Sequence, residues 1–163
     1  MLQRAFACLA LGLISACGGP RGNDSGENST VVTAATLGPQ TVRAAAEYLA
    51  EPPYAEASKT LGDRYLMQCR ACHTFDDGGS HMLGPNLHNI IGRPAGTAPG
   101  FRYSKALNEA DIVWTPRAID AWLAEPRRFL PGNQMVYAGV RQAEDRAALI
   151  ASLIRETSIE EDN

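Results

Sequence analysis

The chain has 163 residues, of which 45% are hydrophobic and 20% are charged. This length allows one globular domain with some chain to spare, and the composition excludes wholesale disorder and collagen-like repetition. Fifteen Lys and Arg against eighteen Asp and Glu give a net charge of −3, which is unlike the basic balance of nucleic-acid-binding proteins. We therefore expect a packed core and no nucleic-acid partner.

Residues 1–16 are predicted to be a secretory signal peptide. Arg4 supplies a positive start, residues 5–14 are almost wholly apolar, and two small residues precede Cys17. The apolar run is shorter than the roughly 20 residues that a bilayer-spanning helix needs. Because residues 14–17 (I-S-A-C) resemble a bacterial lipobox, we expect Cys17 to be acylated and to become the first residue of the mature protein. Ordinary cleavage at the same place is the alternative.

Residues 17–56 are predicted to be a flexible linker that tethers the domain. Their first part, residues 18–41, is rich in Gly, Pro, Ser, Thr and Asn and has no sustained apolar period. Residues 42–50 could form a helix, but a fraying turn within a loose linker is the favoured interpretation. A coil of this length would let the domain move roughly 35 Å from its anchor. The domain itself is expected at residues 57–157, followed by an acidic tail at 158–163.

Cys69 and Cys72 point to one site. If Cys8 is removed with the signal and Cys17 carries lipid, these two alone remain, which excludes a disulfide-stapled scaffold. They stand in C-R-A-C-H, and C-x-x-C-H is the attachment signature of c-type haem. Cysteines three residues apart share one face of a helical turn, within reach of the two vinyl groups of one porphyrin, and His73 brings an imidazole to the iron.

Two other interpretations of the cysteine pair are weaker. A thioredoxin-like dithiol normally accompanies a βαβ pattern, which we do not find in this sequence. A structural zinc site would need two further ligands, and His81 and His88 are the candidates. A surface or hydrogen-bonding role is favoured for both histidines.

From Cys69 onward, ordered sequence blocks extend this signal. The stretch of about residues 58–156 resembles the class I (mitochondrial-type) cytochromes c. The matching blocks are G-P-N-L-H (84–88), I-G-R (91–93), A-P-G-F-R-Y (98–103), I-V-W-T-P (112–116), E-P-R-R-F-L-P-G-N-Q-M-V-Y-A-G (125–139) and A-L-I-A-S-L (148–153). The resemblance implies an all-α fold of helices and long loops wrapped around one covalently bound haem c. It also implies a one-electron carrier that is not an enzyme and has no small-molecule substrate.

The resemblance also assigns the site. It implies that His73 is the proximal iron ligand and Met135 the distal one. Met135 follows Pro131 and Gly132, a turn signal that can carry a loop across the far face of the porphyrin, although a core methionine that merely fills a gap is the alternative. Other positions matching cofactor-binding residues of the family are Pro85, whose carbonyl would orient the histidine, Arg93, Tyr103 and Trp114, which would hold the propionates, and Asn133 in the ligand loop.

Several positions depart from the family pattern. Trp122 and Leu107 replace a common tyrosine and asparagine, so we expect a reduced polar network on the distal side. Leu66 and Ser152 stand where relatives cross their first and last helices through an aromatic pair. We expect Gly62 and Leu149 to keep that crossing.

Helix boundaries follow from capping signals. A first helix is expected over residues 58–70, and Ser104 can cap a short second one. Thr115 at the N-cap with Pro116 at the first helical position opens a third, which must end before Pro126. Residues 142–155 close the chain with apolar residues at helical spacing.

The expected function is a periplasmic electron shuttle that a lipid anchors to a membrane. The periplasmic face of the inner membrane is favoured, and the outer membrane is possible. Expected partners are redox complexes such as a quinol:cytochrome c oxidoreductase and a terminal oxidase or reaction centre, with an acidic patch that faces Lys105, Arg127, Arg128 and Arg141. The alternatives are a haem subunit of a larger dehydrogenase and a peroxidase or gas sensor, which would need an open iron position.

Overall fold

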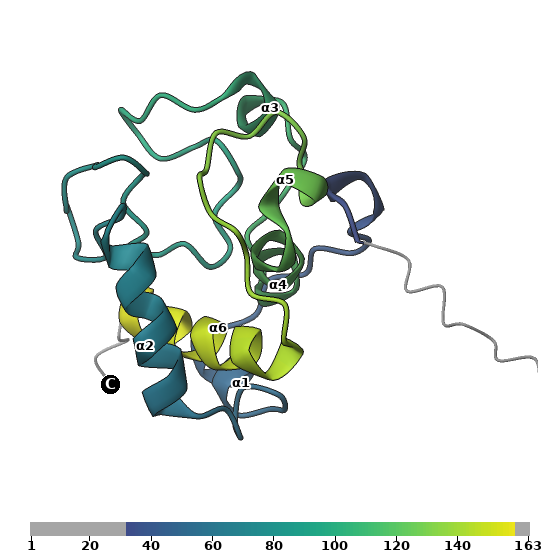
Figure 1. The fold of residues 1–163 in the computed structure, drawn as a ribbon, viewed down its shortest axis with the longest axis vertical. Helices are drawn as coiled ribbons and strands as arrows, with labels where there is room; N and C mark the ends of the chain where they lie inside the picture. The colour runs from purple at the N-terminus through teal and green to yellow at the C-terminus, as the bar shows by residue number, and fades with distance from the viewer. Residues whose placement is uncertain (1–31, 159–163) are drawn as a thin grey trace, which may run out of the picture. The chain divides into compact units, whose positions relative to one another are not determined.

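The fold consists of helices and long loops in the part of the chain that the computed structural model describes, residues 32–158. No strand occurs in this range, and one isolated antiparallel bridge joins Pro94 to Val113. None of its helices is long and apolar enough to cross a membrane. The expected all-α class is confirmed. In chain order (Figure 1), the helices are η1 (Ala34–Thr36), α1 (Ala45–Leu49), α2 (Lys59–Arg70), α3 (Lys105–Asn108), α4 (Pro116–Ala124), α5 (Pro126–Phe129) and α6 (Ala143–Thr157).

Three helices begin at the capping residues that the sequence indicated. The side chains of Ser58, Ser104 and Thr115 each accept a hydrogen bond from the backbone N–H three residues later, at 3.3, 3.3 and 3.2 Å. Each bond satisfies one of the backbone donors that a helix start leaves unpaired. Helix α6 has no such cap. The negative charges of two acidic residues in its first turn instead interact favourably with the positive N-terminal end of its dipole. It extends two residues beyond the expected end.

Helix α2 crosses α6 at Gly62 (Figure 1). A Cβ at this position would overlap the carbonyl of Ala148 and the hydroxyl of Ser152, so the helices approach this closely because residue 62 has no side chain. Leu149 is completely buried beside the crossing. The expected crossing through Gly62 and Leu149 is therefore found, and a hydrogen bond of 2.8 Å from Ser152 to the Asp63 carboxylate adds to it.

An aromatic row runs through α4 and α5. The centroid of the Trp122 ring lies 5.4 Å from that of Trp114 and 5.9 Å from that of Phe129, and both pairs meet edge to face. Trp122 is 7% exposed, and such pairs add about 1 kcal/mol each to the burial itself. This environment agrees with the expected loss of a polar network around position 122.

The N-terminal segment differs from the expected loose linker. Residues 32–56, which we call the strap, pack on the domain: Leu37 is 2% and Tyr48 6% exposed. Two large apolar side chains anchor a segment whose average composition is that of a coil, so a linker prediction that extends to residue 56 is wrong for the strap. The remainder of the predicted linker, the signal peptide, Cys17 and residues 159–163 of the acidic tail lie outside the described residues.

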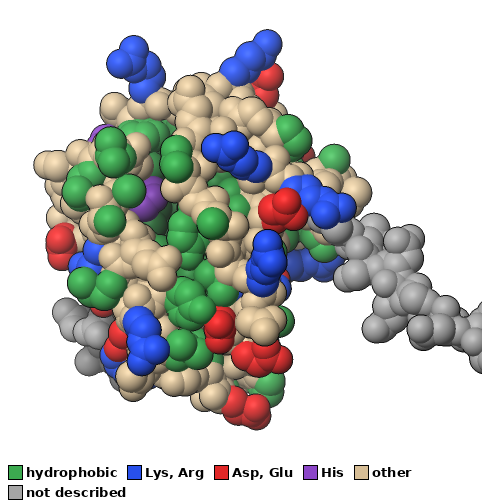
Figure 2. Space-filling view, viewed as in Figure 1, with side chains coloured by type: hydrophobic (Ala, Val, Ile, Leu, Met, Phe, Trp, Pro, Cys, Tyr) green, Lys and Arg blue, Asp and Glu red, His purple; other side chains and the backbone are tan. Residues whose placement is uncertain are grey.

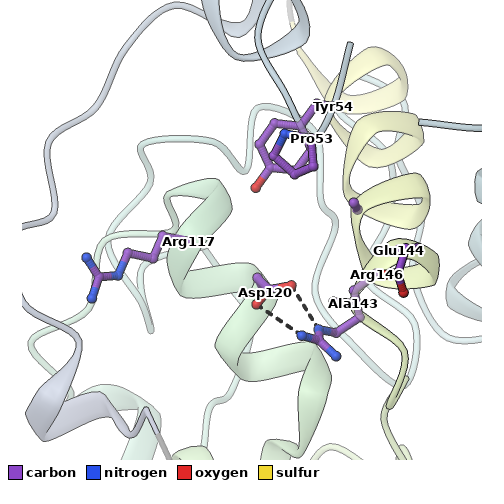
Figure 3. A pocket seen from close by; sticks show the side chains of 8 residues that line it. Pro53, Tyr54, Arg117, Asp120, Ala143, Glu144 and Arg146 are labelled. Atoms are coloured by element: carbon purple, nitrogen blue, oxygen red, sulfur yellow. Dashed lines mark hydrogen bonds and ion pairs between the residues drawn. The ribbon is translucent and has the colours of Figure 1, made fainter. Parts of the chain in front are cut away.

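The end of the strap faces α4 and α6 across a pocket of about 410 Å³ (Figure 3). Pro53 and Tyr54 form one wall, and burial raises the pKa of the Tyr54 phenol to about 12. On the opposite wall an ion pair of 2.8 Å joins Asp120 of α4 to Arg146 of α6. Arg146 also donates to the carbonyls of residues 140 and 141. The wall opposite Pro53 and Tyr54 is thus held together by an ion pair between two helices that are far apart in the sequence.

Candidate functional site

Three candidate site residues share the turn at the end of α2. The backbone N–H groups of Cys72 and His73 both donate to the carbonyl of Cys69, at 3.0 and 2.9 Å. This turn brings two thiols and one imidazole together, as the C-x-x-C-H spacing predicted. Neither thiol is in a disulfide. Burial raises the pKa of the Cys69 thiol to about 11.

A backbone carbonyl fixes the His73 ring. Its Nδ1 lies 2.7 Å from the carbonyl oxygen of Pro85. Because a carbonyl can only accept, the proton is assigned to Nδ1, which leaves the Nε2 lone pair available. Burial lowers the pKa of His73, an effect that the Pro85 bond opposes. The ring is thus held as a neutral imidazole, which is the form that binds a metal.

Gly84 gives the His73 ring its space. A Cβ at residue 84 would lie 2.6 Å from Nδ1 and 2.7 Å from Nε2, closer than real contacts allow. The Gly84 N–H also donates to the Cys72 carbonyl at 2.8 Å. Gly84 was not among the predicted site residues, although its place directly before Pro85 in the G-P-N-L-H block was a usable signal.

The side chain of Asn86 forms hydrogen bonds to both ends of the loop that follows His73. Its side-chain amide donates to the Thr74 hydroxyl at 2.8 Å and to the Asp76 carbonyl at 2.9 Å, and its oxygen accepts from the His88 N–H at 2.9 Å. Asn86 is 9% exposed. The loop that carries Pro85 is therefore rigid at both ends. No local pattern in the sequence marked this role.

Met135 lies in a loop organised by Asn133. The Asn133 amide donates to the carbonyls of Pro126 and Leu130, both at 2.8 Å, and its oxygen accepts from the Met135 N–H at 3.0 Å. Asn133 was predicted to bind the cofactor, and the structure gives its side chain these bonds within the loop. Met135 is half-buried, whereas Val136 is 88% exposed.

The backbones of Arg93 and Trp114, two of the predicted propionate-binding residues, are hydrogen-bonded to each other. The Trp114 N–H donates to the Arg93 carbonyl at 3.0 Å. The Arg93 guanidinium donates to the backbone carbonyls of Asn86 and His88 at 2.9 and 3.2 Å, which leaves further N–H donors of its fork for an anion. Burial lowers the pKa of Arg93. The Tyr103 hydroxyl accepts from the Ala98 N–H at 3.3 Å.

The zinc alternative finds no support in the histidine contacts. His81 Nε2 lies 2.9 Å from the Pro99 carbonyl, and its Nδ1 accepts from the Asn86 N–H at 3.0 Å, so both ring nitrogens are engaged. His88 faces Asp77 at 3.7 Å. Within residues 32–158, no three His, Cys, Asp or Glu side chains gather as a metal site would require. Among the three histidines, only His73 is positioned to act together with the two thiols.

Tyr137 carries a buried polar atom without a partner. Its hydroxyl makes no hydrogen bond within the described part of the chain, and burial raises its pKa to about 12, with further contributions from Cys69 and Tyr65. Two thiols, a neutral imidazole, a thioether and this orphaned phenol form a donor set that suits a haem held by thioether bonds, with nitrogen and sulfur available to its iron. The residues present therefore fit the group.

Curated proteins similar to this chain are cytochromes c. A cytochrome c of Chlamydomonas reinhardtii is 44% identical over 94 residues, which is 58% of this chain and 84% of that protein. A cytochrome c of Trypanosoma brucei brucei is 47% identical over 76 residues, 47% of this chain and 82% of that protein. A cytochrome c2 of Afifella marina is 39% identical over 95 residues, 56% of this chain and 77% of that protein. No family model matches the chain.

Proposed function

This chain belongs to the class I cytochrome c family and is a mono-haem electron carrier, not an enzyme, and from that premise we propose which residues hold the haem and where the protein works. Cys69 and Cys72 form the thioether bonds. His73 and Met135 are the axial ligands. The hydrogen bond of 2.7 Å between His73 and the Pro85 carbonyl carries this assignment, because it leaves Nε2 as a pre-oriented ligand.

The chain's own residues prepare the site for fast electron transfer. When bound, the haem supplies an iron that exchanges one electron. Pro85 and Gly84 keep the His73 ring in one orientation, and Asn133 keeps the backbone of Met135 in place. Arg93 offers N–H donors for the propionates. Ligands that are already oriented need little movement when the oxidation state changes, so electron transfer requires only a brief encounter with a partner.

The partner is proposed to dock on the face that Figure 2 shows. Hydrophobic side chains spread over the middle of this face, with a histidine visible between them. Lys and Arg lie both among them and at the rim, and Asp and Glu lie mainly toward the lower right. Three residues close to the proposed ligands in sequence are exposed apolar ones: Met82 (50%), Leu83 (84%) and Val136 (88%). Two of the expected docking cations are partly countered, since Lys105 faces Glu109 and Arg128 faces Glu125, each at 3.8 Å.

This arrangement supports a partner with an acidic patch around an apolar contact. Because rim charges mainly accelerate encounter, the electron-transfer rate should fall moderately, by a few fold, as salt is raised. A rate that does not depend on ionic strength would contradict the acidic patch.

We place the protein in the periplasm, with Cys17 acylated and the lipid in the membrane. A durable anchor needs two or more acyl chains. Since the strap packs on the domain from residue 32 onward, only fifteen chain steps separate Cys17 from Val32. Their fully extended length is at most roughly 50 Å. The partners are therefore membrane complexes whose docking sites lie within the length of this tether plus the width of the domain, such as a quinol:cytochrome c oxidoreductase and an oxidase or reaction centre.

Mass spectrometry of the mature protein purified from membranes tests both parts. We expect a protein that begins at Cys17, carries acyl chains there and carries one haem on a peptide that contains residues 69–73. A product without covalent haem would overturn the site assignment. A haem protein with an unmodified N-terminus would overturn the anchor alone. Co-purification in fixed proportion with catalytic chains would instead favour a subunit of a larger dehydrogenase.

A further inference from the structure

Two backbone segments that carry Arg93 and Trp114 pair with each other. The Gly92 N–H donates to the Trp114 carbonyl at 3.0 Å, the Trp114 N–H to the Arg93 carbonyl at 3.0 Å, and the Ala95 N–H to the Ile112 carbonyl at 2.8 Å. The bridge between Pro94 and Val113 belongs to the same short ladder. In an extended segment, successive backbone groups point to opposite sides. The groups of Asp111 and Val113 therefore face away from this ladder, along its open edge.

Gln40 of the strap occupies that open edge. Its amide nitrogen donates to the Asp111 carbonyl at 3.0 Å, and its amide oxygen accepts from the Val113 N–H at 2.5 Å. One side-chain amide thus satisfies both a donor and an acceptor, as the peptide group of a third strand would. An edge that is paired in this way cannot open without breaking both bonds.

Buried anchors on both sides hold Gln40 in place. Leu37 is 2% exposed and lies in the core. Tyr48 is 6% exposed, donates from its hydroxyl to the Thr41 carbonyl at 3.2 Å and accepts from the Arg43 N–H at 2.9 Å. Between these anchors, Val42 packs so closely on Gly92 that a Cβ there would lie 2.9 Å from its Cγ1. The strap therefore presses on the residue next to Arg93.

We propose that Gln40 is a positioning residue for the haem site, acting through the backbone of Val113 and Trp114 and, across the ladder, of Arg93. This role rests on the proposed function, because it requires that Arg93 and Trp114 face the propionates. By closing the edge, Gln40 keeps water from the propionate side. Solvent access is one of the factors that set a metal centre's potential, and water favours the oxidised, more positive iron. Opening the edge should therefore lower the reduction potential.

The test compares full-length holoprotein with its Gln40→Ala variant. Amide hydrogen exchange in the reduced protein reports the edge directly: losing the acceptor should speed exchange at Val113 by about fivefold, since one hydrogen bond stabilises by about 1 kcal/mol. The reduction potential should shift to a lower value in the same variant. The control is Gln142→Ala, because Gln142 makes no side-chain cap bond at the start of α6. It should change neither quantity.

A second variant separates the two bonds. Gln40→Glu keeps an acceptor for the Val113 N–H but removes the donor to Asp111, so exchange at Val113 should stay slow. Because the added carboxylate charge itself favours the oxidised iron, the potential is compared only between Gln40→Ala, the control and wild type. The proposal is overturned if exchange at Val113 matches the control. It is also overturned if exchange accelerates while the potential does not move, because Gln40 would then be merely structural. A colourless product from both wild type and variant would refute the proposed function itself.

Discussion

The two sides of the proposed haem site are held in different ways. His73 follows α2 directly, its ring is bonded to the Pro85 carbonyl at 2.7 Å, and Gly84 lies against it. Met135 lies in a loop in which the Asn133 side chain bonds to the carbonyls of Pro126 and Leu130 and to the Met135 N–H. On the histidine side, the ligand atom itself is oriented. On the methionine side, only the backbone beside the ligand is fixed.

This difference predicts what the protein loses when each side is damaged. Damage to the histidine side removes the first ligand and the covalent attachment beside it, so the whole holoprotein is at risk. Damage to the methionine side should cost the second ligand while the thioether bonds retain the haem. Substitutions on the two sides test this contrast, and their expected effects range from loss of the haem to a small change of stability in acid.

His73→Ala should have the largest effect. It removes the proximal ligand next to Cys72, and we expect little or no coloured holoprotein when the variant is expressed with the haem-attachment machinery. The measurement is the ratio of haem absorbance to protein. The matched control is His88→Ala, which removes another histidine in the same region and should keep the haem. Normal haem content in His73→Ala would contradict the role given to His73.

Gly84→Val should destabilise the histidine side without removing a ligand. The added side chain overlaps the His73 ring, and overpacking of this kind costs about 1 to 3 kcal/mol. Denaturant unfolding of the holoprotein measures the loss. Met82→Ala on the same loop is the control, since Met82 is 50% exposed and its truncation should change the free energy of unfolding little. Equal stability of wild type and Gly84→Val would show that the ring does not need this space.

Asn133→Ala should loosen the methionine side only. It leaves the Met135 N–H and two carbonyls without their partner, at a cost of about 1 to 3 kcal/mol. Added imidazole should therefore displace Met135 at a concentration roughly five- to 150-fold lower than in wild type, while the haem stays attached. Titration followed by optical spectroscopy measures this. Gln134→Ala, next to it on the loop, should behave as wild type. Loss of haem from Asn133→Ala would erase the contrast between the two sides.

The smallest effect is expected in acid, at the helix crossing behind the histidine side. Hydrogen bonds from Lys59 and Ser152 hold the pKa of Asp63 below its ordinary value of 3.8. Folding thus favours the ionised carboxylate, so its stabilisation is complete above about pH 3.8 and is lost as the pH falls through the lowered pKa. In Asp63→Asn, the free energy of unfolding should therefore depend less on pH in this range. Glu56→Gln, which removes an exposed carboxylate that forms no ion pair within the described residues, should leave this dependence unchanged.

The contrast also explains what the sequence could predict. Cys69, Cys72 and His73 are adjacent and Pro85 is twelve residues away, so a short motif and one block define the histidine side. Helix starts at Ser58, Ser104 and Thr115 were predictable because capping is local. These signals act within a few residues.

Interactions formed between distant segments were not predictable. Gln40 pairs with backbone 71 and 73 residues away, and nothing in its neighbourhood indicates a partner. Leu37 and Tyr48 stand in a stretch of coil-like composition, so their burial was missed. The bonds of Asn133 exist because its loop folds back on residues 126 and 130, and a family position cannot reveal that.

The central claim is that one iron is bound by His73 and Met135 together. The most direct measurement is the optical and magnetic-resonance spectrum of the oxidised holoprotein, recorded for wild type and Met135→Ala. We predict sulfur ligation in the wild type and its loss in the variant, with the haem still covalently bound in both. A wild-type spectrum without sulfur ligation, or a sulfur signal that persists in Met135→Ala, would contradict the account.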